Sequence, residues 1–312
     1  ENITFMDHYA TGTSGALRIG GTGNLDIINC TFTNITGKYG IQIYPSGVSN
    51  FINNTFTDNK IVSSGSNALI YIGSGEGKTV NIIDNLIDGL GLTGGLSDSS
   101  SYYGAIYNYG SDESSTVNVI NTNFTNINGP LYAVVVSSGK LNMNDSNMYG
   151  NYINRTAYDY YGYGFIEANG DNANIVVRNS SFHDNVLSNS SIYVFKGSVD
   201  IEYSAFYDNT PISEATVLTD VLAAGTAGTV NAEYNWWGSN DGPSTSGASV
   251  SNWVIMNVDP VTANLDTEDI QTITFSIGAD DDLFRNIDDY NDRLKKVFEK
   301  EGLDVVIGQN KQ

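Results

Sequence analysis

The sequence predicts an all-β protein, a right-handed parallel β-helix of about nine coils, and two observations carry this prediction. A short phrase recurs along residues 1–243, with copies such as NCTF at 29–32, NNTF at 53–56 and NSSF at 179–182. Alternating apolar and polar residues precede most copies, which is the pattern of a half-buried strand. A single repeat cannot bury its apolar face alone, whereas stacked repeats share a continuous core.

Each copy of the phrase closes on a large apolar residue, which we call the anchor. The anchors are read as Phe5, Phe32, Phe56, Ile87, Phe124, Met148, Phe182, Phe206 and Trp236. The shortest step between anchors is 24 residues, as from Phe32 to Phe56, and every longer step is read as 24 residues plus an insertion. A propeller blade needs about 40 residues, and a sandwich would not repeat at a fixed phrase. The period therefore favours stacked coils that rise about 4.8 Å each.

Besides the phrase, each coil is expected to contain two short strands. The earlier strand is expected at 17–19, 41–43, 69–72, 133–136 and 193–195, and the later one at 25–27, 80–82, 117–119, 141–143, 175–177 and 199–201. An asparagine commonly stands three residues before the anchor, as Asn29 and Asn53 do. These asparagines are expected to stack as a polar ladder at one turn.

Two long insertions, at 89–104 and 150–164, fall on the same edge of the predicted stack and are rich in tyrosine. Tyr102 and Tyr103 lie in the first, and Tyr158, Tyr160, Tyr161 and Tyr163 lie in the second. A tyrosine presents a rigid apolar face and a hydroxyl group at a small entropy cost, which suits binding. These residues are therefore candidates for a glycan or protein site. The alternative is that the rings fold back and cover the coil edges.

The stretch YNWWGSNDGPS at 234–244 follows the last copy of the phrase. Reading that copy as EYNW places Trp236 at the anchor position, pointing inward, with Trp237 next to it. The repeat stops after Pro243, and an open stack would expose apolar surface and free strand edges. Trp236 and Trp237 are therefore predicted to cap the stack, with sugar stacking by Trp237 as an alternative. Asp241 lacks the other ligands of a calcium loop, so no metal site is predicted.

The last part of the chain departs from the repeat. Residues 244–270 are read as a cap strand around Trp253 and a linker, and 271–312 as a β-α-β segment. In that segment a strand is expected at 273–279, a helix from Leu283 to Phe298 and a second strand at 303–308, because the apolar residues change to helical spacing between the strands.

The charge balance excludes several partners. The chain has 35 acidic and 14 basic residues and a net charge of −21, which argues against nucleic acid and anionic membrane surfaces. No run approaches the roughly 18 apolar residues of a membrane span. No cofactor is predicted, and the single Cys30 allows no internal disulfide. The chain starts at Glu1 without a signal peptide, which we interpret as a processed protein or a fragment.

The repeat phrase and NWWGSNDGP at 235–243 resemble the parallel β-helix repeats of adhesin-like surface proteins of methanogenic archaea and some bacteria, in which an NWWG segment ends the β-helix. The resemblance covers about residues 1–260. It implies an extracellular, non-catalytic protein of the cell surface that binds glycans or cell-surface proteins through its edge loops. Glycosylation is expected if the protein is secreted, and the expected positions are the sequon asparagines Asn2, Asn34, Asn154 and Asn189.

Two other functions remain open. Polysaccharide lyases and glycoside hydrolases use this scaffold, and hydrolysis needs two carboxylates across a cleft. Asp159 and Glu167, with Arg155, are the only candidate group, and the motifs of those enzyme families are absent. The second alternative is a structural subunit that pairs with copies of itself through the ends of the stack, forming a filament or a surface layer.

Overall fold

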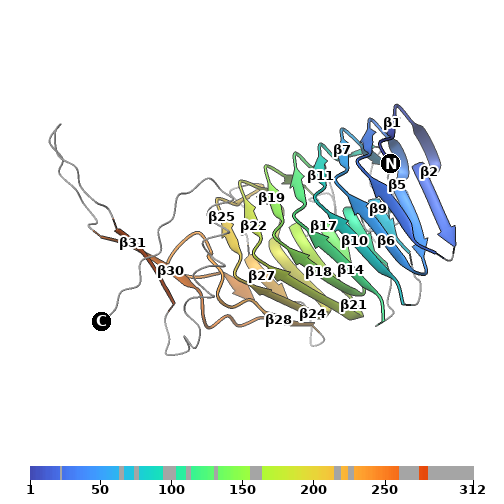
Figure 1. The fold of residues 1–312 in the computed structure, drawn as a ribbon. Coiled ribbons are helices and arrows are strands. Elements are labelled where there is room, and N and C mark those ends of the chain that lie inside the picture. Colours follow the sequence, from blue (N-terminus) through green and yellow to red (C-terminus); the bar gives the residue numbers. More distant parts are fainter. Residues whose placement is uncertain are drawn as a thin grey trace, which may run out of the picture.

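The computed structural model describes residues 1–21, 23–62, 67–73, 77–93, 103–109, 114–129, 133–154, 164–213, 219–223, 228–259 and 274–279. These residues form strands and turns and contain no helix. Nearly all strand pairs are parallel, and they connect successive turns of the chain (Figure 1). The protein is therefore all-β with mostly parallel sheets, an arrangement consistent with the β-helix that the repeat predicts.

The recurring phrase forms one eight-stranded parallel sheet, which we call the anchor sheet. Its strands are β1 (Thr4–Met6), β4 (Thr31–Thr33), β7 (Thr55–Thr57), β11 (Leu86–Asp88), β15 (Asn123–Thr125), β19 (Asn147–Tyr149), β22 (Ser181–His183) and β25 (Ala205–Tyr207). Each anchor pairs with the anchor of the next coil, as Phe32 does with Phe56.

The remaining parallel strands join in one larger sheet, in which two rows of longer strands and one row of short strands run along the stack. The asparagine row comprises β3 (Leu25–Ile28), β6 (Val48–Ile52), β10 (Thr79–Ile83), β14 (Thr116–Ile120), β18 (Lys140–Asn144) and β28 (Gly228–Asn231). The tyrosine row comprises β2 (Tyr9–Gly21), β5 (Thr36–Pro45), β9 (Asn67–Ile72), β13 (Tyr103–Asn108), β17 (Ala133–Ser137), β27 (Thr219–Ala223) and β29 (Thr245–Ser246). Two long strands, β21 (Gly164–Arg178) and β24 (Ser190–Glu202), contribute to both rows.

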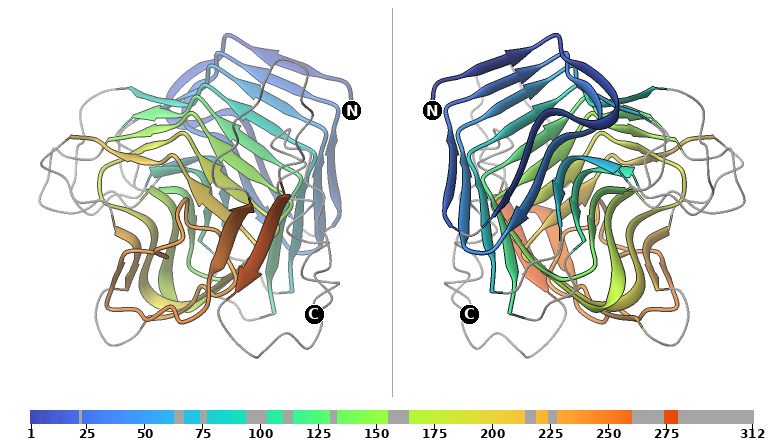
Figure 2. Two further views of the ribbon diagram at one scale, coloured as in Figure 1. Left: turned by 90° about the vertical axis from the view of Figure 1, so that its left-hand side faces the viewer. Right: turned by 90° about the vertical axis from the view of Figure 1, so that its right-hand side faces the viewer.

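Short strands connect the anchor sheet to the tyrosine row. They are β8 (Lys60–Val62), β12 (Gly91–Thr93), β16 (Asn128–Gly129), β20 (Tyr152–Ile153), β23 (Val186–Leu187) and β26 (Thr210–Pro211). A coil thus runs from the anchor sheet through the tyrosine row to the asparagine row and on to the next anchor. Figure 2 looks along the stack and shows successive coils superposed around a common interior. The strands expected from the sequence in both rows are confirmed.

The interior is a continuous apolar core to which the anchors contribute a row of stacked rings. Phe32 lies between Phe5 and Phe56, with ring centroids 4.9 Å and 4.8 Å away and planes within 8° of parallel. The inward residues of the other rows, such as Ile82 and Ile106, complete the core. Strand alternation explains this division, because every second side chain points to the same face.

The corners beside the anchor sheet explain why Asn and Asp recur in the phrase. The residue three before the anchor has a positive φ of 47–58° in each of the first eight coils, for example Asn29, Asn53 and Asp84. Asn and Asp tolerate this left-handed conformation better than other residues that have a side chain. The predicted ladder at this turn is confirmed, because Asn53 Nδ2 donates to Asn29 Oδ1 at 2.8 Å.

A second ladder, which the sequence did not predict, lies one residue further along and is buried. The backbone N–H of Cys30 donates to Asn54 Oδ1 at 2.9 Å, and the N–H of Asn54 donates to Asn85 Oδ1 at 2.9 Å. Later coils use hydroxyls in the same place, as when the N–H of Ser146 donates to Ser180 Oγ at 3.2 Å. Side chains of one coil thereby satisfy corner N–H groups of the preceding coil, which would otherwise be buried without a partner.

The ninth anchor is Trp237, so the prediction that Trp236 takes the inward anchor position is wrong. Ala205 pairs with Trp236, and the ring of Phe206 stacks on that of Trp237 with centroids 4.5 Å apart. The reason is that Tyr234 adopts the left-handed corner conformation, with φ 58°, so the copy is YNWW and not EYNW. Both indoles are nonetheless buried, Trp236 at 9% exposure and Trp237 at 7%.

Parallel pairing continues past residue 243, where the sequence interpretation ended the repeats. β29 pairs with β27, and Trp253 pairs with Asn235. The turn that contains Asn240 packs against Trp253, whose Nε1 donates to the carbonyl oxygen of Asn240 at 3.1 Å. A Cβ on Gly242 would lie 2.6 Å from the indole, so this position accepts only glycine.

The chain then forms an antiparallel pair, β30 (Val254–Asp259) with β31 (Thr274–Ala279). β31 confirms the strand expected at 273–279. The predicted helix at 283–298 and the strand at 303–308 lie outside the described residues. Of the predicted β-α-β segment, the structure thus supports the first strand only.

Candidate binding surface

The outer face of the tyrosine row collects aromatic side chains from three neighbouring coils. Ile41, Ile70 and Ile106 point into the core, so the residues that alternate with them point outward. The strand register places Arg18, Gln42, Tyr71 and Tyr107 at equivalent positions in successive coils. Sequence periodicity alone does not produce this alignment, because the insertions between these coils differ in length.

Five tyrosines form a contiguous group on this face, which we call the tyrosine cluster: Tyr39, Tyr44, Tyr71, Tyr107 and Tyr109. Tyr71 is central, with ring centroids 4.7 Å from Tyr39, 5.7 Å from Tyr107, 6.1 Å from Tyr109 and 6.3 Å from Tyr44. Tyr71 and Tyr107 are buried, whereas Tyr44 is 37% and Tyr109 51% exposed. The buried rings thus support two rings that are accessible from solvent.

Polar groups surround the exposed ring of Tyr44. Gln42 Nε2 donates to the Tyr44 hydroxyl oxygen at 2.8 Å, which fixes the orientation of the ring. The guanidinium carbon of Arg18 lies 6.0 Å from the centroid of the same ring. This distance is within the range of a cation–π contact. An exposed cation and an exposed aromatic ring therefore lie together, and the buried amide of Gln42 holds the ring in place.

A glycine makes room for this arrangement. A Cβ on Gly73 would lie 2.3 Å from Tyr44 Cδ1, so the Tyr44 ring lies directly over the backbone of the next coil. Gly20, which pairs with Tyr44 on the other side, has much more space, because its Cβ would lie 3.9 Å from Tyr44 Cβ.

Two tyrosines of the cluster, Tyr39 and Tyr71, have raised pKa values. Burial and the neighbouring Tyr44 raise the pKa of Tyr39, and the positive charge of Arg18 opposes that rise. Burial, followed by the surrounding tyrosines, raises the pKa of Tyr71 well above its usual value. The hydroxyls of Tyr39 and Tyr71 therefore stay protonated at neutral pH and can both donate and accept hydrogen bonds.

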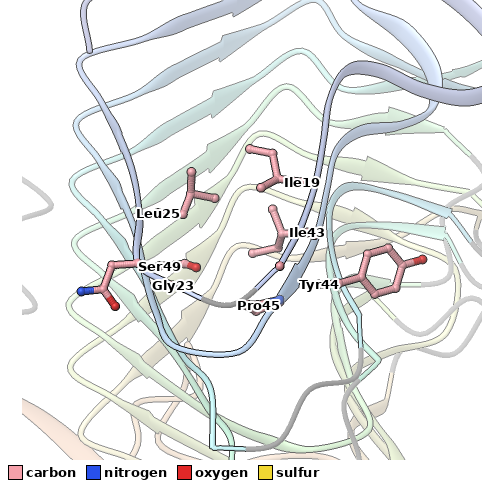
Figure 3. A pocket seen from close by; sticks show the side chains of 10 residues that line it. Ile19, Gly23, Leu25, Ile43, Tyr44, Pro45 and Ser49 are labelled. Atoms are coloured by element: carbon pink, nitrogen blue, oxygen red, sulfur yellow. The ribbon is translucent and has the colours of Figure 1, made fainter.

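A cavity of about 160 Å³ adjoins the cluster, because Tyr44 is among the residues that line it. Ile19, Leu25 and Ile43 point into this cavity, whereas Tyr44 points away from it toward the outside (Figure 3). The cavity is part of the interior of the first coil, and its walls offer few polar groups to a ligand.

A second hollow, of about 490 Å³, lies at the corner after the anchor sheet, where glycines replace larger residues. Gly89 stands in the corner column between Asp58 and Asn126, and Lys60 also lines the hollow. The Asp58 carboxylate leans over Gly89, because a Cβ there would lie 2.9 Å from its Oδ1. No aromatic ring is among the residues that line this hollow.

Most of the site residues predicted from the sequence lie outside the described residues: Tyr102, Tyr158, Tyr160, Tyr161, Tyr163, Arg155 and Asp159. Tyr103 begins β13, where only its backbone is described. Glu167 is 1% exposed and lies on the outer face of β21, two strands beyond Tyr107 through Val136. The described residues therefore do not bring a catalytic group together around Glu167.

The predicted glycosylation sites differ in accessibility. Asn2 and Asn34 are exposed at corners, and Asn34 Nδ2 donates to Asp7 Oδ1 at 2.8 Å. Asn154 is half-buried. The side-chain nitrogen of Asn189 is buried and has no hydrogen-bond partner among the described residues, so a glycan at this position would require local opening.

Sequence reasoning missed the tyrosine cluster, although the strands contain a signal for it. Tyrosines alternate with inward residues in Ile70-Tyr71-Ile72 and again in Ile106-Tyr107-Asn108-Tyr109.

In the part of the chain that the structure describes, no three acidic, histidine or cysteine side chains are grouped to hold a metal ion. The same residues include no helix long and apolar enough to cross a membrane. Comparison with known proteins gives no match to a family model, to a curated protein or to a solved structure.

Proposed function

We propose that this chain is the right-handed parallel β-helix of an adhesin-like protein of the cell surface, and that it binds glycans without catalysis through the tyrosine cluster. The observation that carries the proposal is the pair of exposed rings, Tyr44 and Tyr109, supported by the buried Tyr71. A right-handed path is the strong preference for parallel strands joined by crossover connections.

Glycans suit this surface better than other ligands do. A sugar ring has apolar C–H faces and hydroxyl edges, and a tyrosine offers an apolar face and a hydroxyl in the same way. The cluster is rigid before binding, because the contacts with Tyr71 and the Gln42 hydrogen bond already order its exposed rings. Binding therefore costs little side-chain entropy.

Two observations support a binding role over hydrolysis. Glycoside hydrolysis requires a pair of carboxylates on either side of the sugar. Among the described residues at positions equivalent to Tyr71 and Tyr107, Glu167 is the nearest carboxylate, and it is buried two strands from Tyr107. The acidic surface, with a net charge of −21, and the exposed sequons at Asn2 and Asn34 support placement outside the cell.

The proposal is tested by binding of the whole chain to a glycan array. We expect Tyr44→Ala combined with Tyr109→Ala to weaken binding by at least about tenfold, the loss typical of an aromatic hot spot. Tyr9→Ala is the matched control, because Tyr9 is 76% exposed and does not belong to the cluster. Equal binding by the double variant and the parent chain would contradict the proposal. Capture of a protein and no glycan would identify a protein partner instead.

A further inference from the structure

The cationic group beside the tyrosine cluster is available to an external ligand. Some cations on the outer faces are held by acids: Arg178 Nη2 lies 2.6 Å from Asp200 Oδ2, and Lys196 Nζ lies 3.2 Å from Asp171 Oδ1. Arg18 is exposed, and no carboxylate of the described residues lies within 4.0 Å of it. Exposed Lys60 and Lys140 share this property, but Arg18 is the cation that lies over the Tyr44 ring.

The neighbourhood of Arg18 also lacks negative charge along the stack. The outward positions that follow it in successive coils hold Gln42, Tyr71, Tyr107 and Val136. The first carboxylate in this series is Glu167, five strand spacings from Arg18, which corresponds to roughly 24 Å. An anion bound at Arg18 would therefore meet no repulsion from this row of the described residues.

The chemistry of Arg18 selects the kind of anion. A guanidinium presents a planar fork of donors that matches the two oxygens of a carboxylate. Its carbon is 6.0 Å from the centroid of the exposed Tyr44 ring, and Gln42 pairs directly with Arg18 in the next coil. A sugar ring resting on Tyr44 would thus place a carboxyl substituent within reach of Arg18.

We propose that the tyrosine cluster selects acidic glycans, with the carboxylate of a uronate bound by Arg18 and the pyranose ring stacked on Tyr44. This inference rests on the proposed function, because it names the ligand class of the same surface. It assigns Arg18 the role of the specificity-determining residue, whereas the tyrosines supply the affinity that acidic and neutral sugars share.

The test compares two forms of one ligand. Oligosaccharides of glucuronate and of galacturonate are titrated into the full chain as free acids and as methyl esters, which differ only in the carboxylate charge. We expect the free acid to bind at least about tenfold more tightly, since a hydrogen bond to a charged group is stronger than one between neutral groups. Arg18→Gln is expected to remove this preference, so that the free acid and the methyl ester bind with equal affinity.

Lys140→Gln is the control for general electrostatics. It removes one positive charge from an exposed position on the asparagine row, away from the cluster. The inference is overturned if acid and ester bind equally, if Arg18→Gln weakens acid binding no more than Lys140→Gln does, or if neither oligosaccharide binds at millimolar concentration. If acid and ester bind equally and Tyr44→Ala weakens both, the proposed function stands and only this inference fails. If Tyr44→Ala has no effect on any glycan, the proposed function fails as well.

Discussion

The indole of Trp237 stacks on the phenyl ring of Phe206, with centroids 4.5 Å apart and planes 15° from parallel. Phe206 stacks in turn on Phe182 at 4.5 Å and 5°. The tryptophan therefore extends the anchor row by one position, as the anchor of the ninth copy. Its larger ring covers the last phenylalanine and joins the core.

Replacing Trp237 with alanine should remove this cover. We expect Trp237→Ala to lower the free energy of unfolding by about 3–5 kcal/mol, as for other large buried aromatics. Trp237→Phe should cost less than about 1.5 kcal/mol, because phenylalanine fills the same position in other coils. Urea unfolding followed by circular dichroism measures both variants. An equal loss in the two variants would show that ring stacking is not what matters there.

The buried ladder should be sensitive to the loss of one rung. In Asn54→Ala, the N–H of Cys30 and the carbonyl of Ile27 lose the Asn54 side chain as their partner. We expect a loss of about 2 kcal/mol or more, since each unsatisfied buried group costs about 1–3 kcal/mol. Asn54→Ser should recover part of it, because serine occupies this rung in later coils.

The control for the ladder is Asn50→Ala. Asn50 belongs to an amide ladder on the outer face of the asparagine row, where it donates to Asp26 at 2.7 Å. Water can replace a hydrogen bond on that exposed face, so the expected loss is within about 0.5 kcal/mol. A cost for Asn50→Ala equal to that of Asn54→Ala would contradict the distinction between the two ladders.

The position of Tyr44 can be changed without altering a ligand-binding side chain. Gly73→Ala should push the Tyr44 ring aside, because the new Cβ would meet Cδ1 at 2.3 Å. We expect glycan affinity to fall severalfold, while the circular dichroism spectrum stays that of the parent chain. Gly20→Ala adds the same methyl group on the opposite neighbour, at 3.9 Å from Tyr44 Cβ, and should leave affinity unchanged. If the two variants lose affinity equally, the position of the Tyr44 ring does not determine glycan binding.

Stability should fall at alkaline pH because of the tyrosine cluster. The pKa values of Tyr39 and Tyr71 are raised in the folded chain, mainly by burial. Above pH 10, the unfolded chain therefore binds fewer protons than the folded chain, and the free energy of unfolding decreases as pH rises. Ultraviolet titration of phenolate should show delayed ionisation, and Tyr71→Phe should reduce the alkaline loss of stability. Phenols that all titrate near pH 10 would contradict this prediction.

Asp220 reports on the contact between β27 and the segment after the tryptophans. Burial raises the pKa of Asp220, and hydrogen bonds from the backbone N–H and the hydroxyl of Ser244 to Oδ2, at 2.8 Å and 2.9 Å, oppose the rise. A raised carboxyl pKa favours the folded state below the ordinary value near 3.8, and this contribution is lost as pH rises through the folded pKa.

Ser244→Ala removes the hydroxyl donor and keeps the backbone N–H. The carboxylate then loses one stabilising bond, so we expect the pKa of Asp220 to rise further. Carbon-detected NMR titration of the side-chain carboxyl measures this directly. A lower pKa in the variant would mean that the hydroxyl does not stabilise the carboxylate.

The repetitive part of the fold was predictable because its causes are local. Alternation of apolar and polar residues identifies strands. An asparagine three residues before an anchor, such as Asn29 or Asn53, identifies a left-handed corner, so four consecutive residues suffice. The ninth copy misled the prediction for the same reason. Tyrosine replaces asparagine at the corner positions Tyr203 and Tyr234. Because Trp236 and Trp237 are adjacent and both fit the anchor position, the sequence did not determine which of the two is the anchor.

The candidate site was less predictable because it depends on register between coils. Tyr39, Tyr71 and Tyr107 come together only when Gln42 pairs with Tyr71, and Tyr71 with Tyr107. The insertions between these coils have different lengths, so a fixed period does not align the three strands. The sequence predicted the site in the two long insertions instead, because several of their tyrosines are adjacent in the sequence.

The buried ladder has a direction that bears on how the chain is made. The corner N–H of Cys30 is satisfied by Asn54, 24 residues later, and the N–H of Ser204 is satisfied by Asn235 in the same way. In a nascent chain emerging from a ribosome, the last coil would therefore always have a buried corner N–H without its partner. The partner is supplied only when the next coil has been synthesised. Folding would follow translation at a delay of one coil, with Asn235 supplying the rung for Ser204 near the end of the stack.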